Sequence, residues 1–449
     1  MSIYDIHGDS ASGYSVDGEL LDTVYNMQGE DISDTDAIEE KTGIAYPFTA
    51  MTMTDSSGIA TMSSEHLRNA SSSIKLTNSA KSTAQTVSFT TNINTGGERT
   101  GIWLYTTRRD IGVYGSTASN SYYIKAKVTV NNVQKALALR AGMNYYVWLN
   151  SEVGNTITSI SVEITSTSQA GGSVYLDSVE VGYYMTKKPI VMFNFDMSPN
   201  NFVNDSGFNL FQQYGMKATV QYVLTEDATV GSGAVAFNST NHQTVVGAGH
   251  DYGTYSGWQY WDLNKNPIPN YDDDSHRADF DHHADLMFRI NNDNGVYAPS
   301  IVHSTGFKCG ETYDRALIDG GFPLIRVEYN QTNDACFASV DWDYGEIIPF
   351  FWWGEQDGGS ELGLKARIAI TYAVRNRMCL QIGSHTIQDE LTNSMNIGTE
   401  AMRELLAFCK TKVDNGELIV CTTAEFLRRT MPREKYAVWL TERQKSFVY

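Results

Sequence analysis

The hydrophobic pattern of this chain changes at residues 187–189, Lys-Lys-Pro. Before this point, apolar residues alternate with Ser, Thr and Asn in segments such as 86–91, 123–130 and 157–164. An alternation of period two predicts strands that bury only one face. After it, strands that are almost wholly apolar alternate with helical segments, which is typical of a parallel sheet covered by helices. We therefore expect two different folds in one chain.

Three regions follow from this change of pattern. Residues 1–42 are acidic and rich in Gly, Ser and Asp, and we expect them to form an arm or adaptor rather than a domain. Residues 43–186 contain about ten predicted strands, which indicates an all-β, antiparallel jelly-roll sandwich. Residues 187–449 predict a (β/α) barrel. Its expected strands are 190–195, 218–223, 244–248, 323–327, 378–383 and 417–421, and its expected helices are 207–214, one within 275–292, 311–319, 361–376, 399–413 and 423–430.

The acidic composition excludes several kinds of partner. The 449-residue chain has 33 Lys and Arg against 52 Asp and Glu, a formal net charge of −19, and no basic cluster. We therefore expect neither nucleic acid nor an anionic membrane surface as a partner. The longest apolar stretch, 347–353, is far shorter than the ~20 residues that span a bilayer. The first residues also lack the features of a secretory signal, so we expect neither a membrane-spanning segment nor a signal peptide.

Polar residues follow three of the expected barrel strands: Asp196, then His250 with Asp251, then His385. The carboxyl ends of parallel strands meet at one mouth of a barrel, so we expect these side chains to converge. A carboxylate at the end of an apolar strand is a candidate general base or metal ligand. Alternatively, Asp196 has only a structural role, as a helix cap or as part of a turn into Ser198 and Pro199.

Residues 189–430 resemble the polysaccharide deacetylases, which are metal-dependent esterases that remove N- or O-acetyl groups from chitin-like, peptidoglycan and capsular glycans. Six segments carry the resemblance. Segment 189–196 resembles a strand followed by Thr-Phe-Asp-Asp-Gly, 214–223 is similar to Gly-x-Lys-Ala-Thr-Phe-Phe-Val, and 246–250 resembles Gly-x-Glu-Ile-Gly-Asn-His. Segment 321–326 falls where Gly-Tyr-x-x-x-x-Trp runs, 380–385 resembles Leu-Leu-His, and 422–427 resembles the terminal helix. The resemblance implies a deacetylase-like (β/α) barrel with Asp196 as the catalytic base and His385 as the group that protonates the departing amine or alkoxide.

The chain departs from this family at the metal site. In the family, the second Asp of the Asp-Asp pair binds the metal together with two histidines spaced His-x-x-x-His. Here Met197 stands in place of that Asp, and Thr254 stands four residues after His250. Thioether and hydroxyl groups are weak ligands for zinc, so we expect that the usual metal site does not form. A rebuilt zinc site would use His250 and Asp251; the segment 272–285 is a second source of ligands, although we interpret it as a solvated acidic face.

The aromatic side chains indicate sugar binding, because pyranose faces stack on exposed rings while polar groups bind the hydroxyls. Segment 173–181 also resembles the closing strand of carbohydrate-binding modules. The alternative for each of these rings is that it is buried in the hydrophobic core and does not contact a sugar. The candidate substrate-binding residues are Trp103 and Tyr105 in the sandwich, and Trp258, Trp261, Arg326, Trp352 and Trp353 in the barrel, where the tryptophans lie in segments expected to be loops.

Two functional hypotheses result, and a purely structural scaffold is a third. The first is recognition of a bacterial cell-surface polysaccharide by a bacteriophage tail or virion protein, which binds through a degenerate deacetylase barrel and docks its arm on other virion proteins. Its location is the virion, outside the cell after lysis. The second is an active, metal-dependent N- or O-deacetylase. A homo-oligomer is compatible with the first hypothesis, although no coiled-coil heptad supports it.

Overall fold

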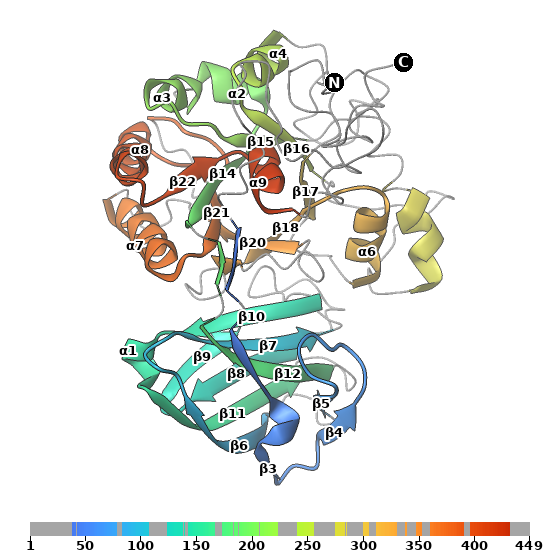
Figure 1. Ribbon diagram of the computed structural model, residues 1–449. Coiled ribbons are helices and arrows are strands. Elements are labelled where there is room, and N and C mark those ends of the chain that lie inside the picture. The colour runs from blue at the N-terminus through green and yellow to red at the C-terminus, as the bar shows by residue number, and fades with distance from the viewer. Residues whose placement is uncertain are drawn as a thin grey trace, which may run out of the picture.

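The computed structural model shows two parts, one built mainly of antiparallel strands and one of parallel strands with helices (Figure 1). The described residues are 38–41, 43–78, 83–106, 124–137, 139, 142–166, 173–182, 184–186, 188–205, 207–222, 240–255, 274–282, 284, 300–304, 311–329, 337–338, 347–352, 360–389 and 396–431.

The first part consists of two antiparallel sheets. The six-stranded sheet contains β10 (Gly142–Trp148), β7 (Thr100–Thr106), β12 (Ser173–Val181), β5 (Ser73–Thr77) and β4 (Ala60–Ser63) in that order, with β2 (Ile44–Pro47) also paired to β12. The five-stranded sheet contains β3 (Thr52–Asp55), β6 (Gln85–Asn94), β11 (Thr156–Ser166), β8 (Ile124–Val130) and β9 (Val133–Leu137). Two short helical segments lie between strands: η1 (Phe48–Ala50) and α1 (Asn150–Val153).

The predicted alternation places a hydrophobic core between these two sheets. In β7, Ile102 and Leu104 join a buried cluster that also contains Phe89 of β6, on the other sheet. Trp103 and Tyr105, at the alternate positions of β7, belong to a different cluster and face outward. The prediction of half-buried strands is confirmed for β6, β8 and β11, whereas β7 and β12 are buried on both faces.

The second part contains a nine-stranded sheet. Its order is β19 (Phe337–Ala338), β21 (Cys379–Gly383), β20 (Ile347–Trp352), β18 (Ile325–Tyr329), β17 (Val302–Ser304), β16 (Asp251–Tyr255), β15 (Thr219–Tyr222), β14 (Ile190–Asp196) and β22 (Ile419–Cys421). All neighbours are parallel except β19 and β21, and β14 pairs in addition with β21. A separate two-stranded sheet joins β1 (Ile38–Lys41), from the predicted arm, to β13 (Tyr184–Thr186).

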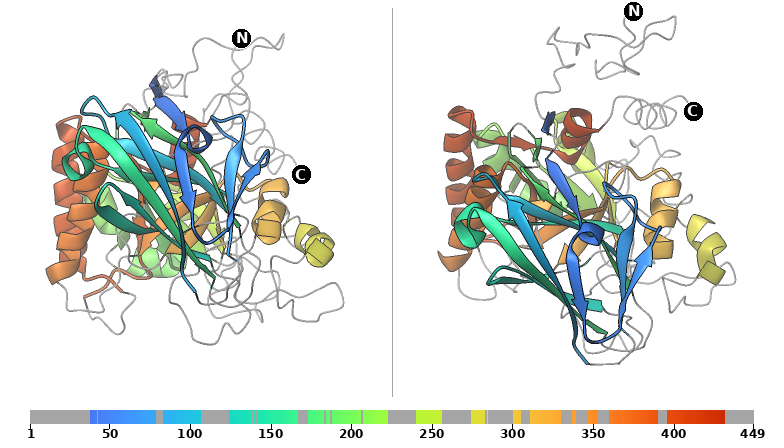
Figure 2. Two further views of the ribbon diagram at one scale, coloured as in Figure 1. Left: turned by 90° about the horizontal axis from the view of Figure 1, so that it is seen from below. Right: turned by 60° about the horizontal axis from the view of Figure 1, so that its bottom comes forward.

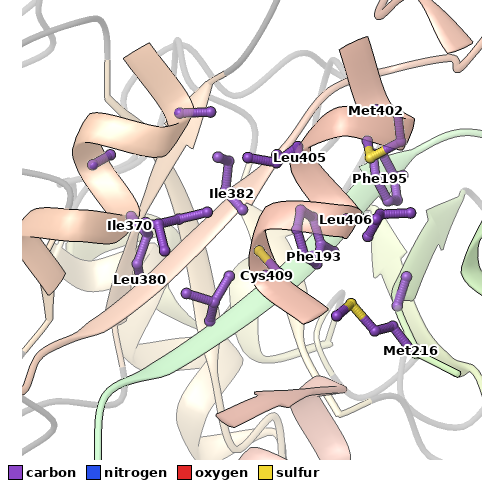
Figure 3. Packing of buried hydrophobic residues seen from close by; sticks show 14 of the residues in the cluster. Phe193, Phe195, Met216, Ile370, Leu380, Ile382, Met402, Leu405, Leu406 and Cys409 are labelled. Carbon is purple, nitrogen blue, oxygen red and sulfur yellow. The ribbon is translucent and has the colours of Figure 1, made fainter. Parts of the chain in front are cut away.

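Helices cover the parallel sheet, and both faces of β14 are buried. The helices are α2 (Pro199–Asn204), α3 (Gly207–Gln213), α4 (Thr240–Gly247), η2 (Asp274–His276), α6 (Glu311–Asp319), α7 (Ser360–Asn376), α8 (Thr399–Asp414) and α9 (Thr423–Thr430). Phe193 and Phe195 of β14 lie in one cluster with Leu406 of α8 (Figure 3), whereas Ile190 and Met192 join a second cluster. Burial on both faces explains why the sequence of β14 is almost wholly apolar.

Most of the expected elements are confirmed, but two expectations are wrong. Residues 244–248 were expected to be a strand, yet α4 ends at Gly247 and the strand is β16, which begins at Asp251. The short apolar run Val245-Val246 cannot distinguish a helix from a strand by periodicity, and only Val245 is fully buried. Residues 347–352 were expected to belong to a Trp-rich loop but form β20, in keeping with the strand preference of aromatic and β-branched residues.

The outward face of β10 and β7 packs against the second part. Trp103, Tyr145 and Val147 belong to the same buried cluster as the apolar residues of the parallel sheet and its helices. Gly101 leaves the space that Tyr145 occupies, because a Cβ there would lie 1.9 Å from the Tyr145 hydroxyl oxygen. The views of Figures 1 and 2 show the antiparallel sheets stacked against one end of the second part. None of the helices in the described part of the chain is long and apolar enough to span a membrane.

Candidate functional site

Asp196, the last residue of β14, is paired with a cation from inside the second part. Both oxygens of its carboxylate accept hydrogen bonds from Arg326 of β18: Oδ1 from Nη1 and Oδ2 from Nη2. Arg326 is fully buried, and the Asp196 side chain is 5% exposed. A bidentate, charge-assisted pair of this kind fixes the plane of the carboxylate.

Two side-chain carboxamides also accept hydrogen bonds from Arg326. Its Nη1 also donates to Oε1 of Gln221 at 3.1 Å and to Oδ1 of Asn194 at 3.4 Å. Asn194 lies two residues before Asp196 on the same face of β14, and Gln221 pairs with Asp196 in the register of β15. Sequence reasoning missed both residues. The signal for Asn194 was a polar residue inside an otherwise apolar strand, on the face that carries Asp196.

His385 reaches Asp196 from the neighbouring strand. The N–H of Asp196 donates to the carbonyl oxygen of Ser384 at 3.0 Å, which joins the carboxyl ends of β14 and β21. His385 follows, with its Nε2 4.0 Å from Oδ2 of Asp196 and its side chain 31% exposed. The structure therefore brings together Asp196, His385 and Arg326. Of the three, the imidazole is the group that solvent reaches.

His250 lies at the other end of its strand, because it follows a helix and precedes β16. Its Nδ1 accepts a hydrogen bond from the N–H of Ala218 at 3.0 Å, and its Nε2 is 3.0 Å from Nε2 of Gln212. Burial, with a smaller contribution from Lys217, lowers the pKa of His250 to about 4. Its ring is therefore a neutral part of the core at pH 7. Three phenylalanine rings surround it: Phe202, Phe208 and Phe211.

Asp251, the first residue of β16, is a structural acceptor. Its Oδ2 accepts hydrogen bonds from the Ser300 hydroxyl and, at 2.9 Å, from the N–H of Ala424. Ala424 lies in the first turn of α9, where unpaired N–H groups favour a carboxylate. The prediction that His250 and Asp251 follow a strand and face Asp196 is wrong, because the strand begins after His250 rather than ending before it.

The residues of this region do not fit the zinc site of the deacetylases. Met197 is buried in the hydrophobic cluster that covers the parallel sheet. Segment 246–250, which resembles Gly-x-Glu-Ile-Gly-Asn-His, ends directly before β16 begins at Asp251 instead of following a strand. Within the part of the chain that the structure describes, no group of three His, Cys, Asp or Glu side chains could hold a metal ion.

The second suggested source of ligands, segment 272–285, carries surface ion pairs where it is described. His276 Nδ1 lies 3.0 Å from Oδ2 of Asp279, and Arg277 pairs with Asp281 at 2.7 Å and with Asp319 at 2.6 Å. These contacts agree with the interpretation of the segment as a solvated acidic face.

The aromatic candidates differ in their surroundings. Trp103 is 1% exposed, with the Arg68 guanidinium 3.8 Å from its ring centroid and the Tyr145 ring at 4.5 Å. Its Nε1 donates to Oε2 of Glu180 at 2.6 Å. Trp103 therefore has no exposed face for a sugar, whereas Tyr105 is partly exposed. Trp258, Trp261 and Trp353 lie outside the described residues, as does the side chain of Trp352 at the end of β20.

Comparisons with known proteins identify no family for this chain. No protein-family model matches it, and no curated protein matches it. Similar solved structures include a putative polysaccharide deacetylase from Mycobacterium smegmatis, with a TM-score of 0.35, 12% identity and coverage of 54% of this chain and 90% of that chain. A family 4 acetyl xylan esterase from Clostridium thermocellum, in complex with a cobalt ion, has a TM-score of 0.33, 15% identity and coverage of 55% and 94%. TmCBM61, in complex with beta-1,4-galactotriose, has a TM-score of 0.20, 10% identity and coverage of 30% and 88%. These scores are too low to carry a functional argument.

Proposed function

We propose that this protein recognises a bacterial cell-surface polysaccharide and that its second part serves as a binding domain. The observation that supports this most is the group at the carboxyl ends of β14 and β21. Arg326 fixes the carboxylate of Asp196, and the partly exposed imidazole of His385 lies 4.0 Å from it. Oriented polar groups at the carboxyl ends of parallel strands are typical of a ligand site.

The same region favours binding over metal-dependent turnover. A metal-dependent esterase obtains much of its transition-state stabilisation from the metal and its activated water. Here Met197 is part of a hydrophobic cluster, and Thr254 stands where the resemblance implies the second histidine. We therefore propose that Asp196, Arg326 and His385 position a glycan without hydrolysing it.

We also propose the finer architecture expected from the sequence. Residues 43–186 would form a jelly roll, which two antiparallel sheets around one core support. Residues 187–449 would form a deacetylase-like barrel. The additional pairing of β14 with β21 supports this, because it links two distant members of the parallel strand order.

An active deacetylase remains the second candidate, and one observation favours it. Asp196 and His385 are the residues to which the resemblance gives the roles of base and acid, and they lie side by side. Zinc would have to be bound by ligands other than His250 and Asp251 in their present positions.

One experiment separates these candidates. Purified peptidoglycan and acetylated capsular polysaccharide are incubated with the protein, with and without Zn²⁺ or Co²⁺, and both acetate release and co-sedimentation are measured. The test variant is His385→Ala. The matched control is His276→Ala, because His276 has a side-chain exposure of 29% and also lies near an aspartate.

Binding without acetate release, weakened about tenfold in His385→Ala and unchanged in His276→Ala, supports the proposal. Acetate release that requires metal and is lost in His385→Ala identifies the protein as a deacetylase. If the protein neither binds the glycans nor releases acetate, the scaffold hypothesis is supported.

We further propose that the protein is a virion component. This rests on the acidic, Gly/Ser/Asp-rich arm 1–42 and on the pairing of two glycan-related resemblances in one chain. Mass spectrometry of purified virions from the organism or phage that encodes it tests this proposal, and its absence from intact particles contradicts it.

A further inference from the structure

The outward face of the six-stranded sheet is divided into two areas. One area packs against the second part through Trp103 of β7 and Tyr145 of β10, and Tyr105 of β7 lies at its border. The other area carries Tyr105, Tyr175 and Lys75, which alternate with the core residues of β7, β12 and β5. The segment between β4 and β5 runs over this second area.

His66, in that segment, is fixed against two aromatic rings. Its imidazole lies flat on Tyr105, with ring centroids 3.6 Å apart and planes within 7°, and it meets Tyr175 edge-on at 4.5 Å. The residue nevertheless remains partly exposed. Burial lowers the pKa of His66, which favours the neutral form of the ring. A neutral ring that is already immobilised loses little conformational entropy when a ligand stacks on it.

The backbone at His66 is held in a conformation that disfavours side chains. Its φ of 54° lies in the left-handed region, where a non-glycine residue is strained. The carboxylate of Asp177 anchors the following turn, since it accepts hydrogen bonds from the N–H groups of Arg68 at 2.9 Å, Asn69 at 3.2 Å and Ala70 at 3.3 Å. Strain maintained at the residue that presents the ring points to a role for the ring itself.

Hydrogen-bonding groups border His66. Oε2 of Glu65 accepts a hydrogen bond from the Tyr175 hydroxyl at 2.9 Å and lies 3.9 Å from Nζ of Lys75. Glu65 is exposed and Lys75 is partly exposed. Glu65 and Lys75 therefore offer one hydrogen-bond acceptor and one donor beside the imidazole, and their charges cancel. Adjacent hydroxyls of a pyranose can both donate and accept, and they match this combination.

We propose that His66, Glu65 and Lys75 form a binding site for a neutral pyranose unit, with the imidazole against the sugar face and the ion pair bonded to adjacent hydroxyls. The site is distinct from the group around Asp196. It rests on the proposed function, because it would bind the same polysaccharide. Trp103, a candidate sugar-binding residue from the sequence, is instead buried between Arg68 and Tyr145.

Two substitutions of His66 separate binding from folding. His66→Ala removes the ring and keeps the strained backbone, whereas His66→Gly removes the ring and relieves the strain. The probes are chitohexaose, xylohexaose, mannohexaose and a purified neutral capsular polysaccharide, measured by titration calorimetry with the full chain. We expect both variants to bind the best of these probes about tenfold more weakly than the wild type. We expect His66→Gly to melt at a higher temperature than His66→Ala, and His276→Ala to bind as the wild type does.

The outcomes distinguish this inference from the proposed function. If the wild type binds and both His66 variants bind equally well, the site is not at His66, while polysaccharide recognition stands. If only the less stable His66→Ala variant binds weakly, the effect comes from folding and the inference is again overturned. If the wild type binds none of the neutral probes but binds the polysaccharides of the acetate-release experiment, the preference for a neutral sugar is wrong. Failure to bind any glycan overturns both proposals.

Discussion

The two ends of the parallel strands use the same residue types in different ways. At the carboxyl ends, Asp196 pairs with Arg326, and His385 beside it remains partly exposed. At the amino end of β16, His250 and Asp251 are buried and accept hydrogen bonds from backbone N–H groups. The residue types alone therefore do not identify a site. What distinguishes the two pairs is the end of the strand at which they stand, because only the carboxyl ends present side chains to a ligand.

Removal of one partner of the buried ion pair gives the largest expected effect. Asp196→Asn leaves Arg326 buried without a counter-charge, so we expect the free energy of unfolding to fall by about 3–5 kcal/mol. Asp281→Asn, which breaks a partly exposed ion pair with Arg277, should cost less than about 1 kcal/mol. Urea unfolding of the two variants at pH 7 measures the difference.

The double variant Asp196→Asn/Arg326→Met provides the control, because it removes both charges. We expect it to be more stable than Asp196→Asn alone. A cost for Asp196→Asn as small as that for Asp281→Asn would show that the pair is not buried as described. Because Asp196→Asn is expected to destabilise the fold, a loss of affinity in this variant could not be attributed to the binding site itself.

The pH dependence of stability tests the other end of the strands. The folded state lowers the pKa of His250 to about 4, from an ordinary value of about 6.5. Below pH 6.5 the unfolded chain binds a proton that the folded chain excludes, so stability falls as the pH falls from about 6.5 to about 4. The difference in pKa corresponds to about 3 kcal/mol. Urea unfolding between pH 7 and pH 4 should show a steeper loss for the wild type than for His250→Gln, and equal slopes would contradict the buried neutral ring.

The sequence predicted the convergence of Asp196 and His385 because each directly follows an apolar strand, and that pattern is local. It did not predict their partner, since Arg326 is 130 residues from Asp196 and only the fold brings the two together. The placement of His250 failed because β16 has the sequence Asp-Tyr-Gly-Thr-Tyr, which lacks aliphatic residues, while the neighbouring valines lie in a helix. Because the hydrophobic signal of this strand is so weak, a prediction from periodicity assigns the strand to the nearby apolar run instead.

The antiparallel sheets show a similar limit. Trp103 and Tyr105 were candidate sugar-binding residues and lie on the outward face of β7, but the sequence carries no information on what covers that face. The cover consists of the second part, against which Trp103 packs, and of the segment between β4 and β5, whose His66 and Arg68 stack on Tyr105 and Trp103. A histidine with a positive φ has no sequence signature, so this feature could be found only in the structure.

The smallest expected effect comes from repeating the aspartate-to-asparagine substitution at the amino end. Asp251→Asn keeps one side-chain oxygen that can still accept the hydrogen bond from Ala424, and the two donors named above, the Ser300 hydroxyl and this N–H, are both uncharged. The cost should be about 1 kcal/mol, from the weaker interaction with the Ser300 hydroxyl and with the first turn of α9. Urea unfolding of this variant next to Asp196→Asn compares one chemical change at the two ends. A cost for Asp251→Asn equal to that for Asp196→Asn would mean that the acid at the amino end also neutralises a buried positive charge, and the division of roles between the ends would then fail.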